Sequence, residues 1–454
     1  MSLYSVPLSQ MGEGFDPLLL HELNPQRYPY LLQSVSHGSV QARYDILFAF
    51  PGQQILWQPG DSSTFLAQLD AQWQRAQPTA PIPPSEAALP FRGGWFLSLA
   101  YELATEIEPT LDLPFPESDL PPAFATAIPA ALIIDHESQQ LHLVAETGQA
   151  SLLSLMREDL NSIAAVGYER SVVAPSVLSV EEDEPLHYLA GVERIKRYIL
   201  EGDVFQVNLS RAWRVELAAQ VTATQLYRRL RQHNPAPFAA LVSHGESAII
   251  SSSPERLIDV KAGRISTRPI AGTRPRGADD LADQQLSNTL LGHPKERAEH
   301  VMLIDLERND LGRVCQPGTV LVDELMVLES YAHVHHIVSN VSGKLRPNVT
   351  PGQAIGAVFP GGTITGCPKV RCMEIIRSLE QGARGPYTGS LGYLNYNGDM
   401  DLNILIRTMY KEGAKLVFRT GAGIVADSVA SCELEETRTK AKGLLRALGV
   451  CGEG

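Results

Sequence analysis

Hydrophobic and polar positions follow clear patterns in the second half of the chain. In residues 187–201, apolar side chains recur at the spacing of one helix face, and Gly202 follows as a typical helix end. We therefore predict a helix over 187–201 that packs one face against a core. Its apolar positions are Tyr188, Val192, Ile195 and Ile199.

The next segment, residues 203–211, alternates between apolar and polar positions. The polar positions are Gln206, Asn208 and Ser210, and the apolar ones are Phe205, Val207 and Leu209. This alternation predicts a β-strand with one apolar face and one polar face. The polar face could be solvated, or its amide side chains could line a pocket.

Residues 389–409 are typical of a β-hairpin, because Asn397-Gly398 is a strong two-residue turn signal between two apolar runs. The second strand is expected to place Leu402, Ile404 and Ile406 on one face and Asn403, Leu405 and Arg407 on the other. Another strand is expected over 415–425. A final helix follows, with an apolar stripe of Leu434, Ala441, Leu445 and Leu448. Because strands and helices mix without regular βαβ alternation, we predict an α+β fold.

Length and composition narrow the class of protein. The chain has 454 residues, about two to three domain-equivalents, and an ordinary share of hydrophobic residues. The polar stretch 168–186 is our candidate boundary, which gives an N-terminal region over 1–175 and a chemistry-bearing region over 186–450. The Pro-rich residues 75–90 are expected to form a surface loop. A net charge of -13 disfavours a general nucleic-acid binder.

The five cysteines are an odd number, and their spacings match no zinc motif. We interpret them as reduced thiols in a cytoplasmic protein. The N-terminus lacks a basic region followed by an apolar run, so no secretory signal is expected. No apolar stretch reaches the ~18 residues of a transmembrane helix, so no membrane span is expected.

Two predicted helices carry acidic faces. Glu296 and Glu299 are three residues apart, and Glu433, Glu436 and Lys440 share a face opposite the apolar stripe. Such spacing is most often a solvated helix face. The alternative is that one carboxylate from each helix holds Mg²⁺, which typically takes one or two protein carboxylates plus substrate oxygens.

A Gly-rich segment, F-P-G-G-T-I-T-G-C-P-K, spans residues 359–369. It lacks the Gly-Lys-Ser/Thr of a phosphate loop, so nucleotide binding is disfavoured. We expect a turn that opens a helix at Pro368. The turn is either an ordinary cap or, through its free backbone N–H groups, a site for a carboxylate.

Histidines and one glutamate add candidates. In Y-A-H-V-H-H-I-V-S, alternation sends His336 to one face and His333 and His335 to the other, and a zinc site would need more ligands nearby. Glu255 follows an apolar strand in S-S-S-P-E-R. A lone Glu is usually a surface residue. Near a metal ion and a leaving hydroxyl, it could instead act as a general acid.

Together these segments resemble the chorismate-utilising enzymes, a family that includes anthranilate, aminodeoxychorismate, isochorismate and salicylate synthases. The resemblance covers most of residues 188–445 and implies an anthranilate synthase-like α+β fold, two-layered, with large mixed or antiparallel sheets flanked by helices. The motifs are G-D-V-F-Q-V-N-L-S-R (202–211), S-P-E-R (253–256), R-P-I-A-G-T-R-P-R-G (268–277), K-E-R-A-E-H-V-M-L-I-D-L-E-R-N-D-L-G-R-V (295–314), H-I-V-S (336–339), F-P-G-G-T-I-T-G-C-P-K (359–369), G-D-M-D (398–401), I-R-T (406–408), and G-A-G-I-V-A-D-S with E-L-E-E-T-R-T-K (421–428, 433–440).

The resemblance also implies roles for individual residues. Glu255 is expected to be the general acid for loss of the C4 hydroxyl of chorismate. His336 and Thr363 are expected to line the ring. The implied magnesium ligands are Glu299 and Glu436, with Glu296 and Glu433 as water-mediated neighbours.

Further residues are implied as contacts of the substrate. Their common task is to hold the carboxylates of chorismate, a dianion for which an arginine offers a bidentate clamp. They are Tyr393, Arg407, the backbone of Gly421 and Gly423, Gly362 in the Gly-rich turn, and Lys440 beside the metal-bound carboxylate.

Position 206 separates the branches of the family by nucleophile. Isochorismate and salicylate synthases resemble each other in having Lys there, which activates water. Gln206 cannot act as such a base, so amination is favoured over hydration. Asn208 in Q-V-N-L-S and the segment A-R-Y-D-I (42–46) favour the aminodeoxychorismate branch, which supplies 4-aminobenzoate for folate. Ala271 in R-P-I-A-G-T favours the anthranilate branch, because aminodeoxychorismate synthases typically have a covalent Lys there. We predict the aminodeoxychorismate branch, by a route without a covalent adduct, and keep the anthranilate branch as the alternative.

The ammonia is expected from another protein. The chain contains no G-x-C-x-G nucleophile motif of a glutaminase, so the family's glutamine amidotransferase subunit is the implied partner. A hypothesis of a different class is a catalytically silent binding homologue. Substitution at Glu255, Glu299, Glu436 or His336 would have indicated it, and all four carry the expected residue type.

Overall fold

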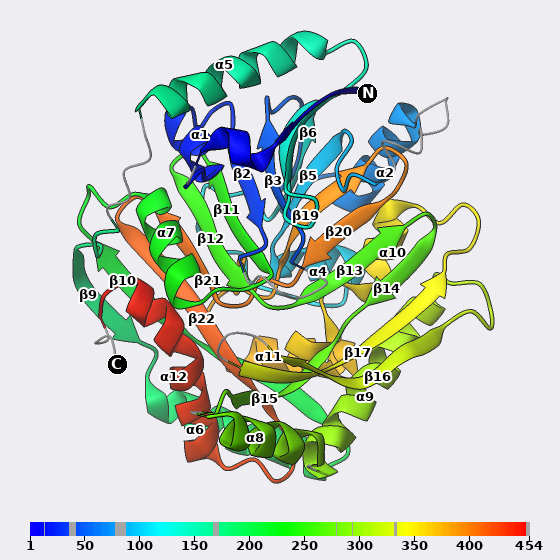
Figure 1. Ribbon diagram of the computed structural model, residues 1–454. Helices are drawn as coiled ribbons and strands as arrows, with labels where there is room; N and C mark the ends of the chain where they lie inside the picture. The colour runs from blue at the N-terminus through cyan, green and yellow to red at the C-terminus, as the bar shows by residue number, and fades with distance from the viewer. Residues whose placement is uncertain are drawn as a thin grey trace.

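Two large antiparallel sheets form the centre of the molecule, and helices cover them on the outside (Figure 1). The computed structural model describes residues 1–12, 14–35, 42–77, 88–166, 172–277, 279–292, 294–330 and 334–450. His333 and Cys451 lie outside these residues, as do positions 78–87 of the expected Pro-rich loop. All strand pairs described between named strands are antiparallel, which confirms the predicted α+β class with antiparallel sheets flanked by helices.

The first sheet, here called sheet A, has 12 strands in the order β1-β8-β7-β3-β2-β11-β12-β21-β22-β10-β18, with β9 also paired to β10. Its strands are β1 (Ser2–Pro7), β2 (Tyr30–Gln33), β3 (Tyr44–Ala49), β7 (Ala130–Asp135), β8 (Gln140–Ala145), β9 (Val177–Glu182), β10 (Gln206–Leu217), β11 (Phe238–His244), β12 (Ser247–Ser253), β18 (Gly366–Cys367), β21 (Thr408–Glu412) and β22 (Lys415–Ile424).

The second sheet, sheet B, has 10 strands in the order β15-β17-β14-β13-β20-β19-β5-β6-β4, with β16 also paired to β17. Its strands are β4 (Gln54–Trp57), β5 (Gly94–Leu99), β6 (Ala123–Ile128), β13 (Arg256–Lys261), β14 (Arg264–Thr267), β15 (Ile270–Pro275), β16 (Leu321–Ser330), β17 (Val334–Lys344), β19 (Ser390–Asn395) and β20 (Met400–Asn403).

The helices are short apart from four of 16 to 19 residues, namely α5, α6, α9 and α12. They are α1 (Leu18–Leu23), α2 (Phe65–Ala76), α4 (Ala104–Ile107), α5 (Ala150–Val166), α6 (Pro185–Leu200), α7 (Ala223–His233), α8 (Asp280–Gly292), α9 (Pro294–Gly312), α10 (Pro351–Val358), α11 (Lys369–Leu379) and α12 (Ala430–Ala447), with 3-10 turns η1 (Leu8–Met11), η2 (Tyr101–Leu103) and η3 (Gly362–Ile364). No helix in the described part of the chain is long and apolar enough to cross a membrane.

Both sheets contain strands from each half of the chain. In sheet A, β2 pairs with β11, and in sheet B, β5 pairs with β19. The described part of the predicted boundary stretch, 172–186, contains β9, which pairs with β10. The N-terminal residues therefore extend the same two sheets that carry the motifs of the second half.

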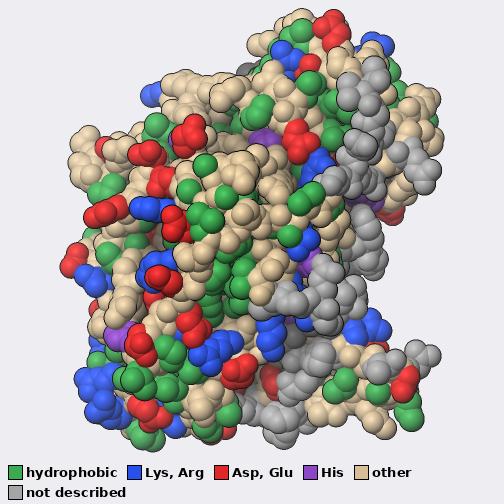
Figure 2. Space-filling model, turned by 90° about the vertical axis from the view of Figure 1, so that its left-hand side faces the viewer, with side chains coloured by type: hydrophobic (Ala, Val, Ile, Leu, Met, Phe, Trp, Pro, Cys, Tyr) green, Lys and Arg blue, Asp and Glu red, His purple; other side chains and the backbone are tan. Residues whose placement is uncertain are grey.

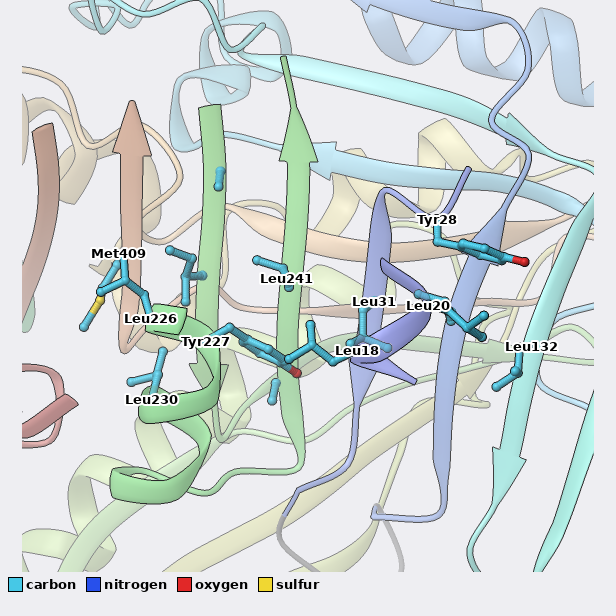
Figure 3. Packing of buried hydrophobic residues seen from close by; sticks show 14 of the residues in the cluster. Leu18, Leu20, Tyr28, Leu31, Leu132, Leu226, Tyr227, Leu230, Leu241 and Met409 are labelled. Carbon is cyan, nitrogen blue, oxygen red and sulfur yellow. The ribbon is translucent and has the colours of Figure 1, made fainter. Parts of the chain in front are cut away.

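Apolar faces hold the layers together. One cluster packs α1, α5, α7 and α12 on the outer face of sheet A, and Figure 3 shows Leu226, Tyr227 and Leu230 of α7 directed at its strands. A second packs α2, α9 and α10 on sheet B, and a third, with Phe48 and Phe96, fills the space between the sheets. Each fully buried Leu or Phe side chain stabilises the fold by about 1.5–3 kcal/mol.

The periodicity-based predictions for the ends of the motif region are confirmed with one exception. The helix over 187–201 is α6, the strand over 415–425 is β22, and the final helix is α12. The exception is Phe205: β10 begins only at Gln206, and Phe205 is 67% exposed instead of contributing to an apolar face.

The predicted hairpin over 389–409 is confirmed only as far as Asn403. β19 and β20 pair around Asn397-Gly398, but the chain then leaves sheet B and enters sheet A as β21. Residues 404–407 form the crossing, and Arg407 has a positive φ of 52°, which ends the strand alternation there. The predicted second face of Asn403, Leu405 and Arg407 is therefore wrong.

Two such crossings lie side by side and locate the candidate site. The chain passes from β12 of sheet A to β13 of sheet B through Glu255, and it returns from β20 to β21 through residues 404–407. The backbone N–H of Ile404 donates to the carbonyl of Glu255 at 3.0 Å. This pairing brings Glu255 and Arg407 to the place where the two sheets meet.

Candidate active site

Strands β10 and β22 form one wall of the candidate site. Gln206 and Asn208 lie on the same face of β10, and Asn208 pairs in register with Gly423. A Cβ atom at Gly423 would lie 2.1 Å from Nε2 of Gln206, and one at Gly421 would lie 2.7 Å from Oδ1 of Asn208. Glycine is therefore needed at both positions to leave room for the two amide side chains.

The two amides present hydrogen-bond acceptors that no protein group uses. Nδ2 of Asn208 donates to the carbonyl of Thr363 at 3.3 Å, which orients the amide. Oδ1 of Asn208 and Oε1 of Gln206 are buried, and neither has a partner among the described residues. Leaving a buried acceptor unpaired costs about 1–3 kcal/mol, so these atoms are suited to meet donors of a ligand.

Glu255 is buried, with 4% of its surface exposed. Burial raises the pKa of this carboxyl to about 7, although the Thr363 hydroxyl, the backbone N–H of Ile270 and the charge of Lys440 act in the opposite direction. The Thr363 hydroxyl is close enough to influence the pKa but lacks the geometry of a hydrogen bond, and Oε1 of Glu255 and Oγ1 of Thr363 are both buried without a partner. A carboxyl with this pKa carries its proton for much of the time near neutral pH, as a general acid requires.

His336 and Arg407 approach the site from β17 and from the β20–β21 crossing. His336 is 3% exposed, and burial together with the positive charge of Arg407 lowers its pKa to about 4, against a hydrogen bond with the backbone of Gly272. The imidazole is therefore neutral near pH 7. The guanidinium of Arg407 makes no hydrogen bond or ion pair with any described residue, so it is available to an anion.

Helix α12 brings Lys440 and Glu436 to the same wall. Nζ of Lys440 donates to the carbonyl of Gly421 at 2.9 Å and lies 2.7 Å from Oε1 of Glu436. Both side chains are nearly half exposed. The predicted helical face of Glu433, Glu436 and Lys440 thus lies beside Gly421, with Lys440 neutralising Glu436.

The four glutamates predicted to hold Mg²⁺ come from α9 and α12, and β15 lies between these helices (Figure 1). Oε2 of Glu296 would be 2.7 Å from a Cβ atom at Gly272 of β15, which places Glu296 beside the His336 side of the site. Carboxylate oxygens are the donors that Mg²⁺ prefers. Within the described residues, however, no group of three or more acidic, histidine or cysteine side chains is gathered that could hold a metal ion. These glutamates are of the residue type that suits the ion, but they do not form a complete metal site by themselves.

The structure places Tyr393 elsewhere. Tyr393 lies on β19 between the sheets, packs against Phe48 and Phe91, and lines a separate cavity of about 760 Å³. None of the other predicted site residues lines that cavity. The tyrosine that reaches the site is Tyr387, whose hydroxyl oxygen would be 3.0 Å from a Cβ atom at Gly421.

Tyr387 was missed because its signal is weak. It lies in the Pro- and Gly-containing turn R-G-P-Y-T-G, where an aromatic residue is not part of any periodic pattern. Tyr393, in contrast, lies in a strand with clear apolar alternation. An aromatic residue inside a Gly/Pro turn, directly before a strand of the core, is the signal that could have identified it.

Two small residues of the motifs have different environments. A Cβ atom at Gly362 would be 2.5 Å from Cδ2 of Leu306, so this glycine is required by the packing of the turn on α9. Ala271 is 9% exposed on β15 and pairs with Ile337. Its methyl group cannot form a covalent bond to a substrate.

The cysteines and His335 have no identified chemical role in the candidate site. Cys315, Cys367, Cys372 and Cys432 form no disulfide bonds with one another. His335 is buried and contacts Oγ of Ser330 at 2.7 Å and Oδ1 of Asp283 at 2.9 Å, on the other side of β17 from His336. The opposite orientation of the two histidines follows the predicted alternation.

A cluster of charged residues around a fully hydrogen-bonded carboxylate lies next to the site, on the same face of β10. We call Ser210, Glu380, Arg384 and Arg419 the Glu380 cluster. The Glu380 carboxylate accepts five hydrogen bonds, two from Ser210, two from Arg384 and one from Arg419, at 2.6–3.1 Å. Burial alone would raise the pKa of Glu380, but the two arginines hold it below its ordinary value.

Arg384 connects this cluster to the site. Its guanidinium donates to the carbonyl of Asn208 at 2.8 Å and to that of Ile364 at 3.1 Å, and it lies over the ring of Tyr387 with 5.7 Å to the centroid. One side chain thus holds the site strand, the Gly-rich turn and the tyrosine in fixed relation. None of the cluster was predicted as part of the site.

Comparison with known proteins places this geometry in a family. A family model described as chorismate binding enzyme matches residues 29–446. The chain is 42% identical to an anthranilate synthase component I-like protein of Synechocystis sp. over 89% of this chain and 83% of that protein. It is also 42% identical to aminodeoxychorismate synthase component 1 of Bacillus subtilis, over 80% and 78%.

Solved structures agree with the sequence relatives. The crystal structure of anthranilate synthase component I from Streptococcus pneumoniae superimposes with a TM-score of 0.78 at 31% identity, over 96% of this chain and 98% of that one. This likeness confirms the predicted anthranilate synthase-like fold. The match of the family model to residues 29–446, together with these relatives, shows that the chain belongs to the chorismate-binding enzyme family.

Proposed function

We propose that the chain is the synthase component of an aminodeoxychorismate synthase, which converts chorismate and ammonia to 4-amino-4-deoxychorismate and water. The observation that carries the proposal is the pair of Gln206 and Glu255. Gln206 stands where a base would activate water, and its buried amide cannot take a proton. Glu255, with a pKa of about 7, can deliver one. This pairing suits ammonia, which is already a nucleophile, and a leaving hydroxyl that needs protonation.

The chemistry needs one carbon–nitrogen bond to form while the C4–oxygen bond breaks. Ammonia adds at C2, the ring double bond shifts, and Glu255 protonates the C4 hydroxyl, which leaves as water. Because Ala271 offers no covalent nucleophile, a second ammonia then attacks C4 and the C2 amine leaves as ammonia. Neutral His336 can lie against the ring without adding charge.

Chorismate is a dianion, so the site must supply positive charge. Arg407, which has no other partner among the residues described, would clamp one carboxylate. Lys440 and the hydroxyl of Tyr387 lie at the Gly421 end of the pocket. We propose that Mg²⁺ is held there by Glu299 and Glu436, with Glu296 and Glu433 acting through water. A bound Mg²⁺ would polarise the ring carboxylate.

The ammonia source is proposed to be a separate glutamine amidotransferase subunit. Two of the relatives are named as component I or component 1 of their enzymes. This chain carries no glutaminase nucleophile motif. With saturating ammonium at alkaline pH, the isolated chain is expected to turn over chorismate without the partner.

One observation favours a second candidate, anthranilate synthase component I. Ala271 is the residue of the anthranilate-type motif, and its buried methyl group matches a route without a covalent adduct. In that route, the C2-amino intermediate loses pyruvate and becomes anthranilate. The equal 42% identity to relatives named as each kind of enzyme does not separate the two candidates.

Product analysis tests the proposal. Purified chain, chorismate, Mg²⁺ and excess ammonium are incubated with and without an aminodeoxychorismate lyase, and the products are separated by chromatography. 4-Aminobenzoate that appears only with the lyase is the expected result. Fluorescent anthranilate without lyase would instead establish the second candidate. Binding of chorismate without any turnover would indicate a catalytically silent homologue.

A further inference from the structure

A second cavity lies on the far side of the Glu380 cluster from the candidate site. It has a volume of about 330 Å³, which is within the range of small-molecule sites. We call it the rear cavity. All of its lining residues are described, and they include Pro116, Leu120 and Val417 as apolar wall and Tyr387, Lys415 and Arg419 as polar wall.

The rear cavity and the candidate site share one face of sheet A. Along β10, alternate residues Asn208, Ser210 and Ala212 point to the same side, and they line the site, the Glu380 cluster and the rear cavity in turn. On β22, Gly421 and Arg419 follow the same order. The Glu380 cluster and the Tyr387 ring therefore separate the two spaces.

The wall of the rear cavity contains a guanidinium with unused donors. Arg419 is 4% exposed; its Nε donates to Oγ of Ser210 at 3.0 Å and its Nη2 to Glu380 at 3.1 Å. Its Nη1 makes no hydrogen bond to any residue that the structure describes. Because Arg419 lines the cavity, these N–H groups are available to a molecule inside it.

Charge in the wall also favours an anion. The Glu380 cluster contains two guanidinium groups and one carboxylate, which leaves one buried positive charge in excess. A further buried acid, Glu102, accepts from the backbone N–H groups of Arg384 and Gly385, and burial raises its pKa to about 7, so it neutralises that charge only in part. The lining also contains two carboxylates, Glu117 and Glu412, but four cations outnumber them, namely Arg214, Arg384, Lys415 and Arg419. A buried charge without a full counter-ion attracts an anion of matching size.

We propose that the rear cavity is a binding site for a small organic carboxylate. Its carboxylate meets Nη1 of Arg419, and its apolar body lies against Pro116, Leu120 and Val417. The site is separate from the one in which we place chorismate, so it does not depend on the proposed reaction. A ligand there contacts Tyr387 and Arg419 directly, and through them it reaches the wall of the candidate site.

Isothermal titration calorimetry of the full-length chain with benzoate tests the proposal. Because benzoate could also bind at Arg407, the titration is made with the Arg407→Lys variant. Benzoate is expected to bind this variant, whereas benzamide, its uncharged isostere, and inorganic phosphate are expected to bind at least tenfold more weakly. Benzamide that binds equally would overturn the role of the carboxylate, and tighter binding of phosphate would overturn the apolar wall.

Two further substitutions in that background locate the site. Ala383→Phe fills the rear cavity from its rim without changing a charge, and it is expected to abolish benzoate binding. Arg419→Lys is expected to weaken it at least tenfold. Arg264→Lys, at an exposed ion pair with Asp323, is the matched control and should change binding less than twofold.

The outcomes separate this inference from the proposed function. Benzoate binding that persists in the Ala383→Phe variant, or is absent from the Arg407→Lys variant, would overturn the rear-cavity site whatever the product analysis gives. Thermal unfolding of each variant is measured to check that the fold is intact. If Arg419→Lys lowers the melting temperature strongly, the Ala383→Phe result decides alone.

Discussion

Two groups of polar residues lie next to each other on one face of β10 and β22, and they differ in how their hydrogen bonds are satisfied. In the candidate site, Gln206, Asn208, Glu255 and Thr363 each have a buried oxygen without a partner among the described residues. In the Glu380 cluster, one carboxylate accepts five hydrogen bonds. Burial is similar in both groups, so burial alone does not identify which of them binds a ligand.

The difference has a physical meaning. An unpaired buried acceptor costs about 1–3 kcal/mol in the folded state and regains that free energy when a ligand supplies the donor. The fully hydrogen-bonded carboxylate of Glu380 gains nothing from a ligand, but it holds Arg384, which in turn fixes the positions of Asn208 and Tyr387. We therefore assign binding of the substrate to the first group and positioning of the site wall to Glu380 and Arg384 of the second. The charged residues on the outer surface follow neither pattern, because acidic and basic side chains are interspersed on the face in Figure 2.

Glu255→Gln tests the first group most severely. The amide keeps the size of the carboxyl but cannot donate a proton to a leaving hydroxyl, so turnover of chorismate with ammonium should fall by about 10²–10⁴-fold. The measurement is chorismate consumption followed by absorbance. Glu193→Gln, at an exposed position on α6, is the control and should retain activity. A loss below tenfold in Glu255→Gln would contradict the role of general acid.

Glu380→Gln tests the second group. Removing the only carboxylate between two buried arginines leaves uncompensated charge, and the free energy of unfolding should fall by about 3–5 kcal/mol. Urea denaturation of the variant and of Glu435→Gln, an exposed ion-pair partner on α12, provides the comparison. A change below 1 kcal/mol would mean that the cluster does not stabilise the site wall.

The sequence predicted those parts of the fold that depend on local periodicity. The stripe of Tyr188, Val192 and Ile195 gave α6, and alternation gave β10 and β22, because burial of one face imposes the period of the element. The period does not reveal which sheet a strand joins. Alternation therefore predicted that the second hairpin strand extends through residues 404–407, where the chain instead crosses from sheet B to sheet A.

The same limit applies to the candidate site. Motifs with chemistry, such as the one around Glu255, could be recognised because the residue types are adjacent in sequence. The Glu380 cluster could not, because Ser210 and Glu380 are 170 positions apart and only the packing of β10 against the end of α11 brings them together. Tyr393 was chosen over Tyr387 for the same reason: apolar alternation draws attention to strands, whereas Tyr387 acts from a turn.

Arg407→Lys tests whether the candidate site binds a carboxylate of the substrate. Arg407 is the cation of the site that has no partner in the described structure, and lysine keeps the charge but loses the bidentate geometry. The KM for chorismate should rise about 10–100-fold, since hydrogen bonds to charged groups contribute about 1.5–3 kcal/mol. Steady-state kinetics check it, with Arg264→Lys as control. An unchanged KM would place the substrate carboxylates elsewhere.

The pH dependence of turnover is expected to show the smallest effect, and it tests the role of Glu255 most directly. Its pKa in the folded chain is about 7, above the ordinary value of 4.5, so the acid form required for catalysis is lost as pH rises through 7. At constant free ammonia, obtained by adjusting total ammonium, kcat should fall about tenfold per pH unit above 7. A flat profile from pH 6 to 9 would contradict the assignment.

The free energy of unfolding should also change over this pH range, and it should decrease as the pH rises. Because folding raises the pKa of Glu255, its contribution to stability is fully present below 4.5 and is lost as pH rises through 7, a change on the order of 3 kcal/mol. Burial also raises the pKa values of Glu102 and Glu307 to about 7 and that of Asp259 to about 6, so several groups share the total pH dependence. The difference in unfolding free energy between the parent chain and Glu255→Gln isolates one of them. Between pH 5 and pH 8, the unfolding free energy of the parent chain should decrease relative to that of Glu255→Gln. If it stays constant, the carboxyl of Glu255 is in contact with solvent, and its unpaired oxygen would then be hydrated and would not be held ready for a substrate.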